Sequence, residues 1–405
     1  MRWASSISGV ESFDVALEQT TEELRAALDG EAPDLLLVFV SREHQHRWHE
    51  LPGQLRDRFA NARIVGCSAA GVAGDGREIE QAPGLALSAA RLPGVEVTPF
   101  HLDPDAVDLT TPADPAYERQ RWFEALGIAD GPAPHLLLLP DPFSWPGPPM
   151  LASLDRSFPD AVKIGGLASG GGRPGEHRLF CDRSVHHRGT VGVALRGNLE
   201  IESVVAQGCR PIGSPLFITR RQNNIIFELD GRLAVDVLQQ VLDELDPGDQ
   251  ALARTSLFLG LSMHPRREIY GQGDFLVRNL IGVDPTTGAI GVGAELDHAA
   301  VVQFHLRDAE TSAAELRDLL AEHAFASRGH RSQAALMFSC LGRGRSLYGE
   351  ADHDSALLRE QLGHDLPIAG FFCNGEIGPI GGYNSHTFLH GYTSAVMLFR
   401  PATMI

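Results

Sequence analysis

One pattern recurs four times along this 405-residue chain and constrains its fold more than any other feature. Each instance begins with a run of aliphatic residues, which is typical of a strand buried on both faces. Further along the chain, each instance has a second short segment in which an apolar residue is followed by glycine, called the glycine junction below. The aliphatic runs are 34–41, 135–142, 256–263 and 335–342, and the glycine junctions are 63–71, 163–171, 279–288 and 367–375. The pairing predicts repeated strand–helix–strand units.

Each unit closes with two strand-like segments around turn residues such as Pro93–Gly94 or Gly197–Asn198, at 85–102, 190–208, 289–306 and 387–399. We expect these to form hairpins. Helical spacing of apolar residues predicts longer helices at 15–28, 116–126, 232–245 and 313–325. The chain is also longer than one hydrophobic core usually supports. The sequence therefore predicts an α/β (mixed α+β) protein of two similar lobes, 1–220 and 221–405, each with mixed sheets flanked by helices.

The net charge of −18, from 34 basic and 52 acidic residues, excludes nucleic acid and anionic membranes as general partners, because both require a cationic face. The N-terminus has no apolar segment typical of a signal peptide, and the longest aliphatic runs are too short to span a bilayer. The five cysteines are scattered and form neither a disulfide framework nor a zinc motif. We therefore expect a cytoplasmic protein without a cofactor or metal.

The whole chain resembles the FIST family (F-box and intracellular signal transduction proteins). The resemblance rests on FSCLGRG at 338–344, LPIAGFFCNGEIGPIGG at 366–382, TFLHGYTSAVMLF at 387–399, QGCRPIGSPLFIT at 207–219 and GCSAAGV at 66–72. It implies a sensory module with an N-terminal and a C-terminal FIST domain that binds a small ligand, usually thought to be an amino acid. The signalling partner would sit on another chain. The connection at 383–386 is longer than the family pattern.

The glycine-rich stretch 370–382 contains one carboxylate, Glu376, whose burial requires a cation or several N–H donors. One hypothesis is that Glu376 meets a ligand ammonium group, while Arg343, Arg345 or backbone N–H groups hold the ligand carboxylate. The alternative is an internal ion pair that pins the turn. Further expected ligand-binding residues are Cys373, Asn374, Gly375, Gly381, Gly382, Cys340, His390, Arg278, Cys67, Ser68, Cys209 and Arg210.

Cys373 also admits an enzymatic interpretation, because a thiol with His390 and Glu376 has the parts of a nucleophile system. Cysteine more often fills apolar space, and sequence proximity does not establish a triad. A cysteine-dependent hydrolase or transferase therefore stays an alternative, as does a scaffold that acts through its surface. Histidines at 44, 46, 49, 186 and 187 match no metal-binding spacing.

Overall fold

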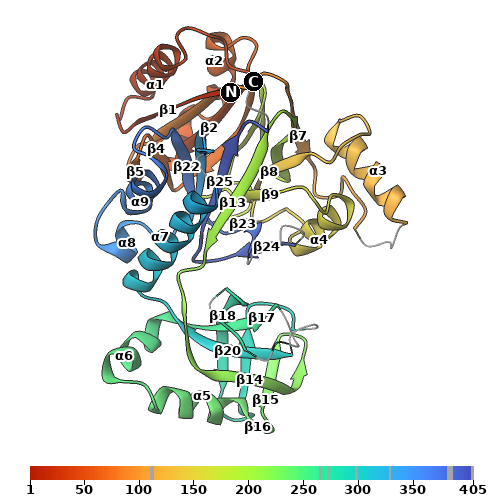
Figure 1. Cartoon of the computed structure of the whole chain (residues 1–405), viewed down its shortest axis with the longest axis vertical. Helices are drawn as coiled ribbons and strands as arrows, with labels where there is room; N and C mark the ends of the chain where they lie inside the picture. Colours follow the sequence, from red (N-terminus) through yellow and green to blue (C-terminus); the bar gives the residue numbers. More distant parts are fainter. Residues whose placement is uncertain are drawn as a thin grey trace. The chain divides into compact units, whose positions relative to one another are not determined.

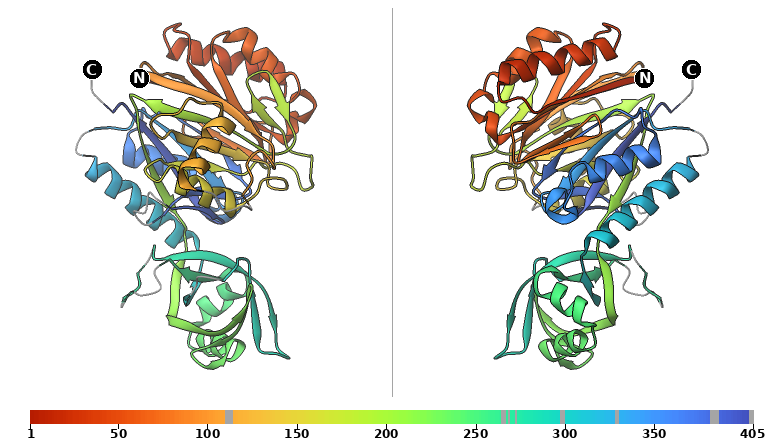
Figure 2. Two further views of the ribbon diagram at one scale, coloured as in Figure 1. Left: turned by 90° about the vertical axis from the view of Figure 1, so that its right-hand side faces the viewer. Right: turned by 90° about the vertical axis from the view of Figure 1, so that its left-hand side faces the viewer.

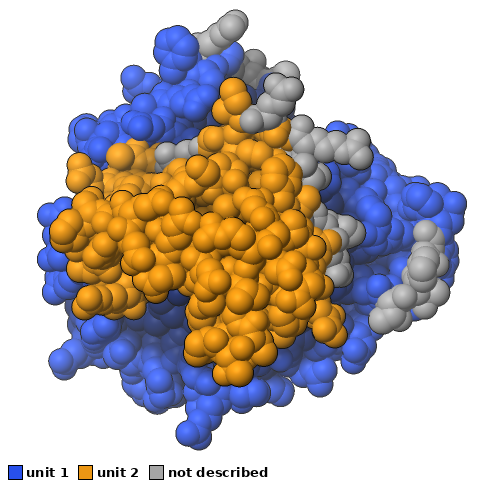
Figure 3. Space-filling view, turned by 90° about the horizontal axis from the view of Figure 1, so that it is seen from below, with its two compact units in different colours: residues 1–206, 316–405 blue, residues 207–315 orange. Residues whose placement is uncertain are grey.

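The computed structural model describes residues 1–109, 114–263, 267, 269–271, 273–296, 300–327, 330–380 and 386–402. The chain forms two compact units, coloured separately in Figure 3. Unit 1 comprises 1–206 and 316–405, and unit 2 comprises 207–315. Both contain strands and helices, so the expected mixed α/β class is confirmed.

Unit 1 is built from three repeats with the same order of elements. Repeat I contains β1 (Arg2–Ser8), α1 (Phe13–Ala27), β2 (Leu35–Ser41), the 3-10 helix Arg42–Arg47, α2 (Leu51–Arg58), β3 (Arg63–Ala69), β4 (Gly71–Gly74), β5 (Arg77–Glu80) and β6 (Leu85–Arg91). Repeat II contains β7 (Val95–Leu102), α3 (Pro115–Leu126), β8 (His135–Pro140), α4 (Pro148–Ser157), β9 (Lys163–Gly166), β10 (Leu179–Cys181), β11 (Ser184–His186) and β12 (Thr190–Gly197). Repeat III contains β13 (Glu200–Ala206), α7 (Ala309–Ala326), β21 (Ala334–Cys340), α8 (Arg345–Tyr348), α9 (His353–Leu362), β22 (Ile368–Cys373), β23 (Glu376–Pro379), β24 (Thr387–His390) and β25 (Ser394–Arg400).

Each repeat centres one mixed six-stranded sheet on a parallel pair: β2–β3 in sheet I, β8–β9 in sheet II and β21–β22 in sheet III. A helix lies between the two strands of each pair, because parallel neighbours require a long crossover. On one side of this pair, the sheet continues with the last strand of the repeat and then with its first strand. These two strands are antiparallel to each other and form the pairs β6–β1, β12–β7 and β25–β13. Three of the four predicted strand–helix–strand units are therefore confirmed.

The other edge of each sheet is completed by a hairpin from a different repeat. The hairpin β4–β5 of repeat I pairs with β22 of repeat III. The hairpin β10–β11 of repeat II pairs with β3 of repeat I. The hairpin β23–β24 of repeat III pairs with β9 of repeat II, which closes the cycle. The three repeats are thus interlocked through exchanged hairpins.

The aliphatic runs are buried on both faces because each sheet packs between two layers. Along β2, Leu37 and Phe39 face a core shared by all three sheets, whereas Leu36 and Val38 face the core beneath α1 and α2. Helices α3 and α4 cover sheet II, and α7 and α9 cover sheet III (Figures 1 and 2). The central core is therefore enclosed by three sheets whose outer faces carry the helices.

The recurring junction glycines are required by close backbone contact between the parallel strands. A Cβ atom on Gly66, Gly165 or Gly370 would lie 1.9, 1.8 or 1.9 Å from the carbonyl oxygen of the residue in register on the neighbouring strand. These three contacts are sterically excluded for any other residue type. The shared position also defines which residues are equivalent in the three repeats.

Unit 2 is inserted after β13 of repeat III and extends into the first part of α7, residues 309–315. It contains a seven-stranded sheet in the order β14-β20-β17-β18-β19-β15-β16, and the helices α5 (Ala234–Asp243) and α6 (Pro247–Ser256). Its strands are β14 (Arg210–Gln222), β15 (Ile225–Leu229), β16 (Arg232–Leu233), β17 (Leu257–Ser262), β18 (Phe275–Asp284), β19 (Ala289–Val292) and β20 (Val301–Leu306). Strands β17 and β18, expected as a fourth strand–helix–strand unit, instead pair antiparallel. That part of the repeat prediction was wrong, because antiparallel neighbours need no helical crossover.

The four predicted hairpins are also wrong. In 85–102, 190–208 and 387–399 the two consecutive strands lie in different sheets, and in 289–306 the strands β19 and β20 are not neighbours. The turn residues correctly mark where the chain reverses, but turn chemistry does not determine which strand becomes the partner. The division into FIST domains at 220/221 stays a prediction, and the compact units separate at 206/207 and 315/316.

Candidate functional site

The junction between the second parallel strand and the exchanged hairpin differs chemically among the three repeats. In each sheet, one residue of the exchanged hairpin pairs with the residue that follows the sheet's junction glycine. The hairpins of repeats I, II and III supply Val72, Leu179 and Glu376, respectively, at this position. Val72 and Leu179 belong to the central apolar core. Glu376 is fully buried at the equivalent position. Repeat III therefore places a carboxylate where the fold elsewhere uses an aliphatic side chain.

One neighbour of Glu376 follows the same trend. Cys373 lies three residues after its junction glycine, at the position of Ala69 in repeat I and Ala168 in repeat II. His390 lies opposite Glu376 across the β23–β24 hairpin, where repeat I has Ile79 and repeat II also has a histidine, His186. Only in repeat III are all three of these positions polar.

The Glu376 carboxylate accepts two described hydrogen bonds. Oε2 accepts the backbone N–H of Thr393 at 3.0 Å, and Oε1 lies 3.3 Å from the Cys373 thiol, which can donate to it. Thr393 follows Tyr392, a non-glycine residue with a left-handed φ of 66°. Such a conformation is strained by about 1–3 kcal/mol in a non-glycine residue.

A hydroxyl group satisfies the equivalent backbone N–H in the other repeats. Gly84 N donates to Ser41 Oγ at 2.8 Å, and Gly189 N donates to Ser144 Oγ at 2.8 Å. Gly84 and Gly189 are equivalent to Thr393 because the carbonyl oxygen of each of the three accepts a backbone N–H from the end of the first parallel strand. The donors are Ser41, Asp141 and Cys340. The turn therefore needs an acceptor, but it does not need a charge.

The Cys373 sulfur has the environment of an unreactive thiol. It is fully buried, and burial followed by the nearby Glu376 carboxylate raises its pKa well above the usual range. The same S–H also lies within reach of the carbonyl oxygen of Ser339, at 3.3 Å, so the two acceptors share one proton. Nε2 of His390 donates instead to the carbonyl oxygen of Gly378 at 2.9 Å. A thiol held in this form is a poor nucleophile.

Arg343, which we expected near a ligand carboxylate, is buried in an internal ion pair. Its Nε and Nη2 donate to the two carboxylate oxygens of Asp354 at 2.7 and 3.1 Å, and Nη2 also donates to Tyr348 at 2.6 Å. This guanidinium and the His353 hydrogen bond hold the pKa of Asp354 well below its usual range, despite burial. Ser339 Oγ donates to Asp354 at 3.0 Å, so a polar network runs from Glu376 through Cys373 and Ser339 to this ion pair.

The remaining unit 1 residues are brought together in part. Asn374 is exposed, and its Nδ2 donates to the carbonyl oxygen of Ala168 at 2.9 Å, while Ser68 Oγ donates to that of Ser169 at 3.1 Å. The junctions of the three repeats are thus hydrogen-bonded to one another, and Gly375 takes part through its carbonyl oxygen. Arg345 is exposed, Cys340 is half-buried and Cys67 is fully buried.

The other predicted residues belong to unit 2 or lie outside the described residues. Arg278, Cys209 and Arg210 belong to unit 2. Arg210 pairs with Asp249 and, at 3.0 Å, with Asp308, while the Nη1 of Arg278 donates to its neighbour's carbonyl oxygen at 2.9 Å. Desolvation lowers the pKa of Arg278 to about 10. Gly381 and Gly382, and 383–385 of the longer connection, lie outside the described residues.

Thr393, Ser339 and Asp354 are site residues that sequence reasoning missed. Asp354 left a usable signal: an arginine beside a buried strand requires an acidic partner, and Asp354 lies in the first turn of α9. The role of Thr393 leaves no such signal, because it acts through its backbone N–H.

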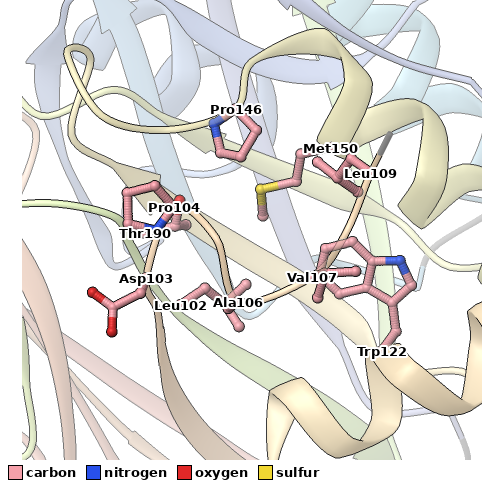
Figure 4. Close-up of a pocket in the computed structure, with 10 residues that line it drawn as sticks. All are labelled: Leu102, Asp103, Pro104, Ala106, Val107, Leu109, Trp122, Pro146, Met150 and Thr190. Carbon is pink, nitrogen blue, oxygen red and sulfur yellow. The ribbon is translucent and has the colours of Figure 1, made fainter. Parts of the chain in front are cut away.

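Two cavities lie elsewhere in unit 1. One of about 10 Å³, with room for about one water, lies among Leu102, Val107, Trp122, Met150 and Thr190 (Figure 4). A wider depression of about 350 Å³ lies at the ends of α7 and α9, beside His323 and Glu360. Among the described residues, no group of three or more His, Cys, Asp or Glu side chains is placed to hold a metal ion. No described helix is long and apolar enough to cross a membrane.

Comparisons with known proteins identify relatives along almost the whole chain. Family models described as the FIST N domain and the FIST C domain match residues 34–232 and 234–379. Two uncharacterized Mycobacterium tuberculosis proteins, Rv0628c and MT0897, are 37% and 36% identical over 98% and 95% of this chain, and 100% and 95% of their own lengths are covered. A solved structure titled "Cyanuric acid hydrolase: evolutionary innovation by structural concatenation" aligns with 99% of this chain and 100% of its own. Its TM-score of 0.28 and 10% identity are too low to support an argument.

Proposed function

Because this chain belongs to the FIST family, whose domains are associated with sensory signal transduction and are thought to bind small ligands, we propose that it is a sensor of an amino acid or a similar small carboxylate. The ligand binds at the junction of repeat III, with its ammonium group on Glu376. The observation that carries this proposal is the buried carboxylate of Glu376 at the position of Val72 and Leu179.

The chemistry of Glu376 supports an ammonium-bearing ligand. A buried carboxylate is costly unless a cation or several donors meet it, and its donors include the Thr393 amide N–H and the Cys373 thiol. A thiol is a weak donor. An ammonium group supplies charge-assisted hydrogen bonds, which are about twice as strong as neutral ones.

A second group must recognise the ligand's carboxylate. Arg343 is bidentate on Asp354, so we assign this role to the exposed Arg345 and to the amide of Asn374, which precedes Glu376 by two residues. Guanidinium groups bind carboxylates through paired hydrogen bonds, whereas amides supply neutral donors.

Ligand binding would change the turn that precedes β25. An ammonium group on Glu376 competes with Thr393 N–H for the carboxylate, and the strained Tyr392 lies next to that amide. Release of this contact shifts the population of turn conformations, which a signalling partner on another chain reads.

The test is thermal unfolding of the full chain against a panel of amino acids and small carboxylates. A ligand at one hundred times its dissociation constant adds about 2.7 kcal/mol of stability. The increase in melting temperature is expected to disappear in Glu376→Gln. The matched control is Glu118→Gln, which alters another buried carboxylate, held by Ser153 and Arg156 in repeat II. A stabilising ligand that acts equally on Glu376→Gln, or no stabilising ligand across a broad panel, would contradict the proposal.

A further inference from the structure

Two thiols occupy one registered position of the parallel pair in sheet III. Cys340, the last residue of β21, lies directly opposite Cys373, the last residue of β22. The corresponding pair in repeat I is Ser41 opposite Ala69. Neither cysteine forms a disulfide in this structure.

The backbone geometry suits a disulfide between them. Neighbouring strands lie about 4.7–4.9 Å apart, and disulfides join Cα atoms that are about 4.4–6.8 Å apart. Residues in register on adjacent strands also direct their side chains to the same face of a sheet. Cys340 lies near enough to raise the pKa of the Cys373 thiol further, after the effects of burial and Glu376.

The two sulfur atoms differ in access. Cys373 is fully buried, whereas Cys340 is half-buried and its sulfur accepts the Gly342 N–H at 3.4 Å. A hydrogen bond from a backbone N–H favours the thiolate form of a cysteine. Cys340 is therefore the sulfur that meets a dissolved oxidant first, and Cys373 is placed to react second.

We propose that Cys340 and Cys373 form a redox-active dithiol that a hydroperoxide oxidises to an intramolecular disulfide. The Cys340 thiolate attacks the terminal peroxide oxygen, the O–O bond breaks, and the protonated leaving group departs as water or an alcohol. Cys340 becomes a sulfenic acid. Cys373 is a poor nucleophile as a thiol, but Glu376 Oε1 at 3.3 Å is placed to accept its proton as the sulfur attacks the Cys340 sulfur. The S–S bond forms, the S–O bond breaks, and the hydroxide leaves as water with that proton. Two thiols and one hydroperoxide thus give one disulfide, one water and one further water or alcohol.

Oxidation has a direct effect on the neighbouring carboxylate. The proton lost by Cys373 is the one placed to donate to Glu376 Oε1 at 3.3 Å, so the disulfide removes one of the carboxylate's two described donors. Oxidation of the dithiol would thereby change the hydrogen bonding of the Glu376 carboxylate. Formation of the disulfide itself does not depend on the proposed ligand function.

The experiment treats the purified full chain with hydrogen peroxide, blocks the remaining thiols after denaturation without a reductant, and identifies the peptides by mass spectrometry. The expected product is a cross-linked pair of peptides containing Cys340 and Cys373, with the other three cysteines still alkylated. Dithiothreitol is expected to restore both thiols. The cross-linked pair is expected to be absent from Cys340→Ser and Cys373→Ala, the second of which installs the residue found in repeats I and II.

The matched control is Cys181→Ser, which removes another half-buried thiol whose burial raises its pKa to about 11. This variant is expected to form the same cross-linked pair as the parent protein. Full alkylation of both Cys340 and Cys373 after peroxide treatment would overturn the proposal. Oxidation of Cys340 to a sulfinic acid without a cross-link, or a cross-link through a different cysteine, would overturn it as well.

Discussion

Repeats I and III follow the same path through their sheets, yet their junctions have opposite chemical character. Repeat I satisfies the turn before its last strand with the Ser41 hydroxyl and fills the adjacent core with Val72. Repeat III uses Glu376 for the same turn and surrounds it with Cys373 and His390. Repeat I thus shows that the fold needs only a hydroxyl acceptor for this turn and an apolar residue beside it. The polar residues of repeat III exceed that requirement, which is why we place the ligand there.

The largest expected effect comes from breaking what the repeats share. Gly370→Ala places a methyl group 1.9 Å from the Met337 carbonyl oxygen, and Gly66→Ala does the same against Val38. Each change forces two parallel strands apart, so we expect a loss of about 3 kcal/mol or more. Urea unfolding, or the soluble yield where the variant does not fold, measures the loss. A large loss in one variant and none in the other would mean that the two junctions are not structurally equivalent.

The next effect comes from converting the repeat III junction into that of repeat I. Glu376→Val leaves the buried Thr393 N–H without its described acceptor, which costs about 1–3 kcal/mol. Adding Cys340→Ser installs the hydroxyl that serves this turn in repeat I, and Cys373→Ala completes the exchange. We expect the triple variant to regain stability in urea unfolding but to show no ligand-induced stabilisation. A triple variant that still responds to the ligand would place the site elsewhere.

A third difference between the repeats should appear as a pH dependence. Glu78, on the hairpin of repeat I, occupies a position where the other hairpins have Val185 and Leu389. Burial, followed by repulsion from Asp354, raises its pKa from 4.5 to about 7. The folded protein therefore holds a proton that the unfolded chain has released over this range.

The contribution of Glu78 is greatest below pH 4.5 and is lost as the pH rises through about 7. Glu78→Gln should flatten this part of the stability profile, measured as melting temperature between pH 5 and 7.5. Glu118→Gln serves as the control, because the Arg156 hydrogen bond lowers the pKa of that carboxyl. An unchanged slope in Glu78→Gln would contradict the assignment.

The smallest expected effect concerns the insertion that distinguishes repeat III from repeat I. In repeat I only residues 9–12 connect β1 to α1, whereas unit 2 separates β13 from α7. Replacement of 207–308 by a short flexible linker should change the stability of unit 1 by less than about 1 kcal/mol, because long surface insertions have small entropic costs. Circular dichroism and urea unfolding measure this change. Failure of the shortened chain to fold would mean that unit 1 depends on unit 2.

The sequence predicted local structure better than strand pairing. The aliphatic runs and junction glycines located the three parallel pairs, because burial on both faces and close backbone contact leave clear residue patterns. The partner of each hairpin could not be predicted, since β4 and β22 are separated by most of the chain. The residue types of a strand predict that it is buried, but they do not predict which distant strand pairs with it.

The candidate site was predictable only through its unusual residue. Glu376 stood out as a lone carboxylate in a glycine-rich apolar stretch, and its burial agrees with that distinction. Arg343 is also a conspicuous charge, but the sequence does not predict its pairing with Asp354, because a loop and the helix α8 separate the two residues along the chain. The equivalence with Val72 and Leu179 emerges only from the strand register.

The cyclic exchange of hairpins has a consequence for how the chain folds during its synthesis on the ribosome. Hairpin β4–β5 emerges early, but its partner β22 lies near the end of the chain. Sheet III therefore cannot be completed until almost all residues have been made, and pairing between such distant segments is slow. Until then the nascent hairpin carries an unpaired strand edge, a feature that promotes aggregation. Emergence of β22, rather than of any earlier repeat, is therefore the step before which unit 1 cannot become stable.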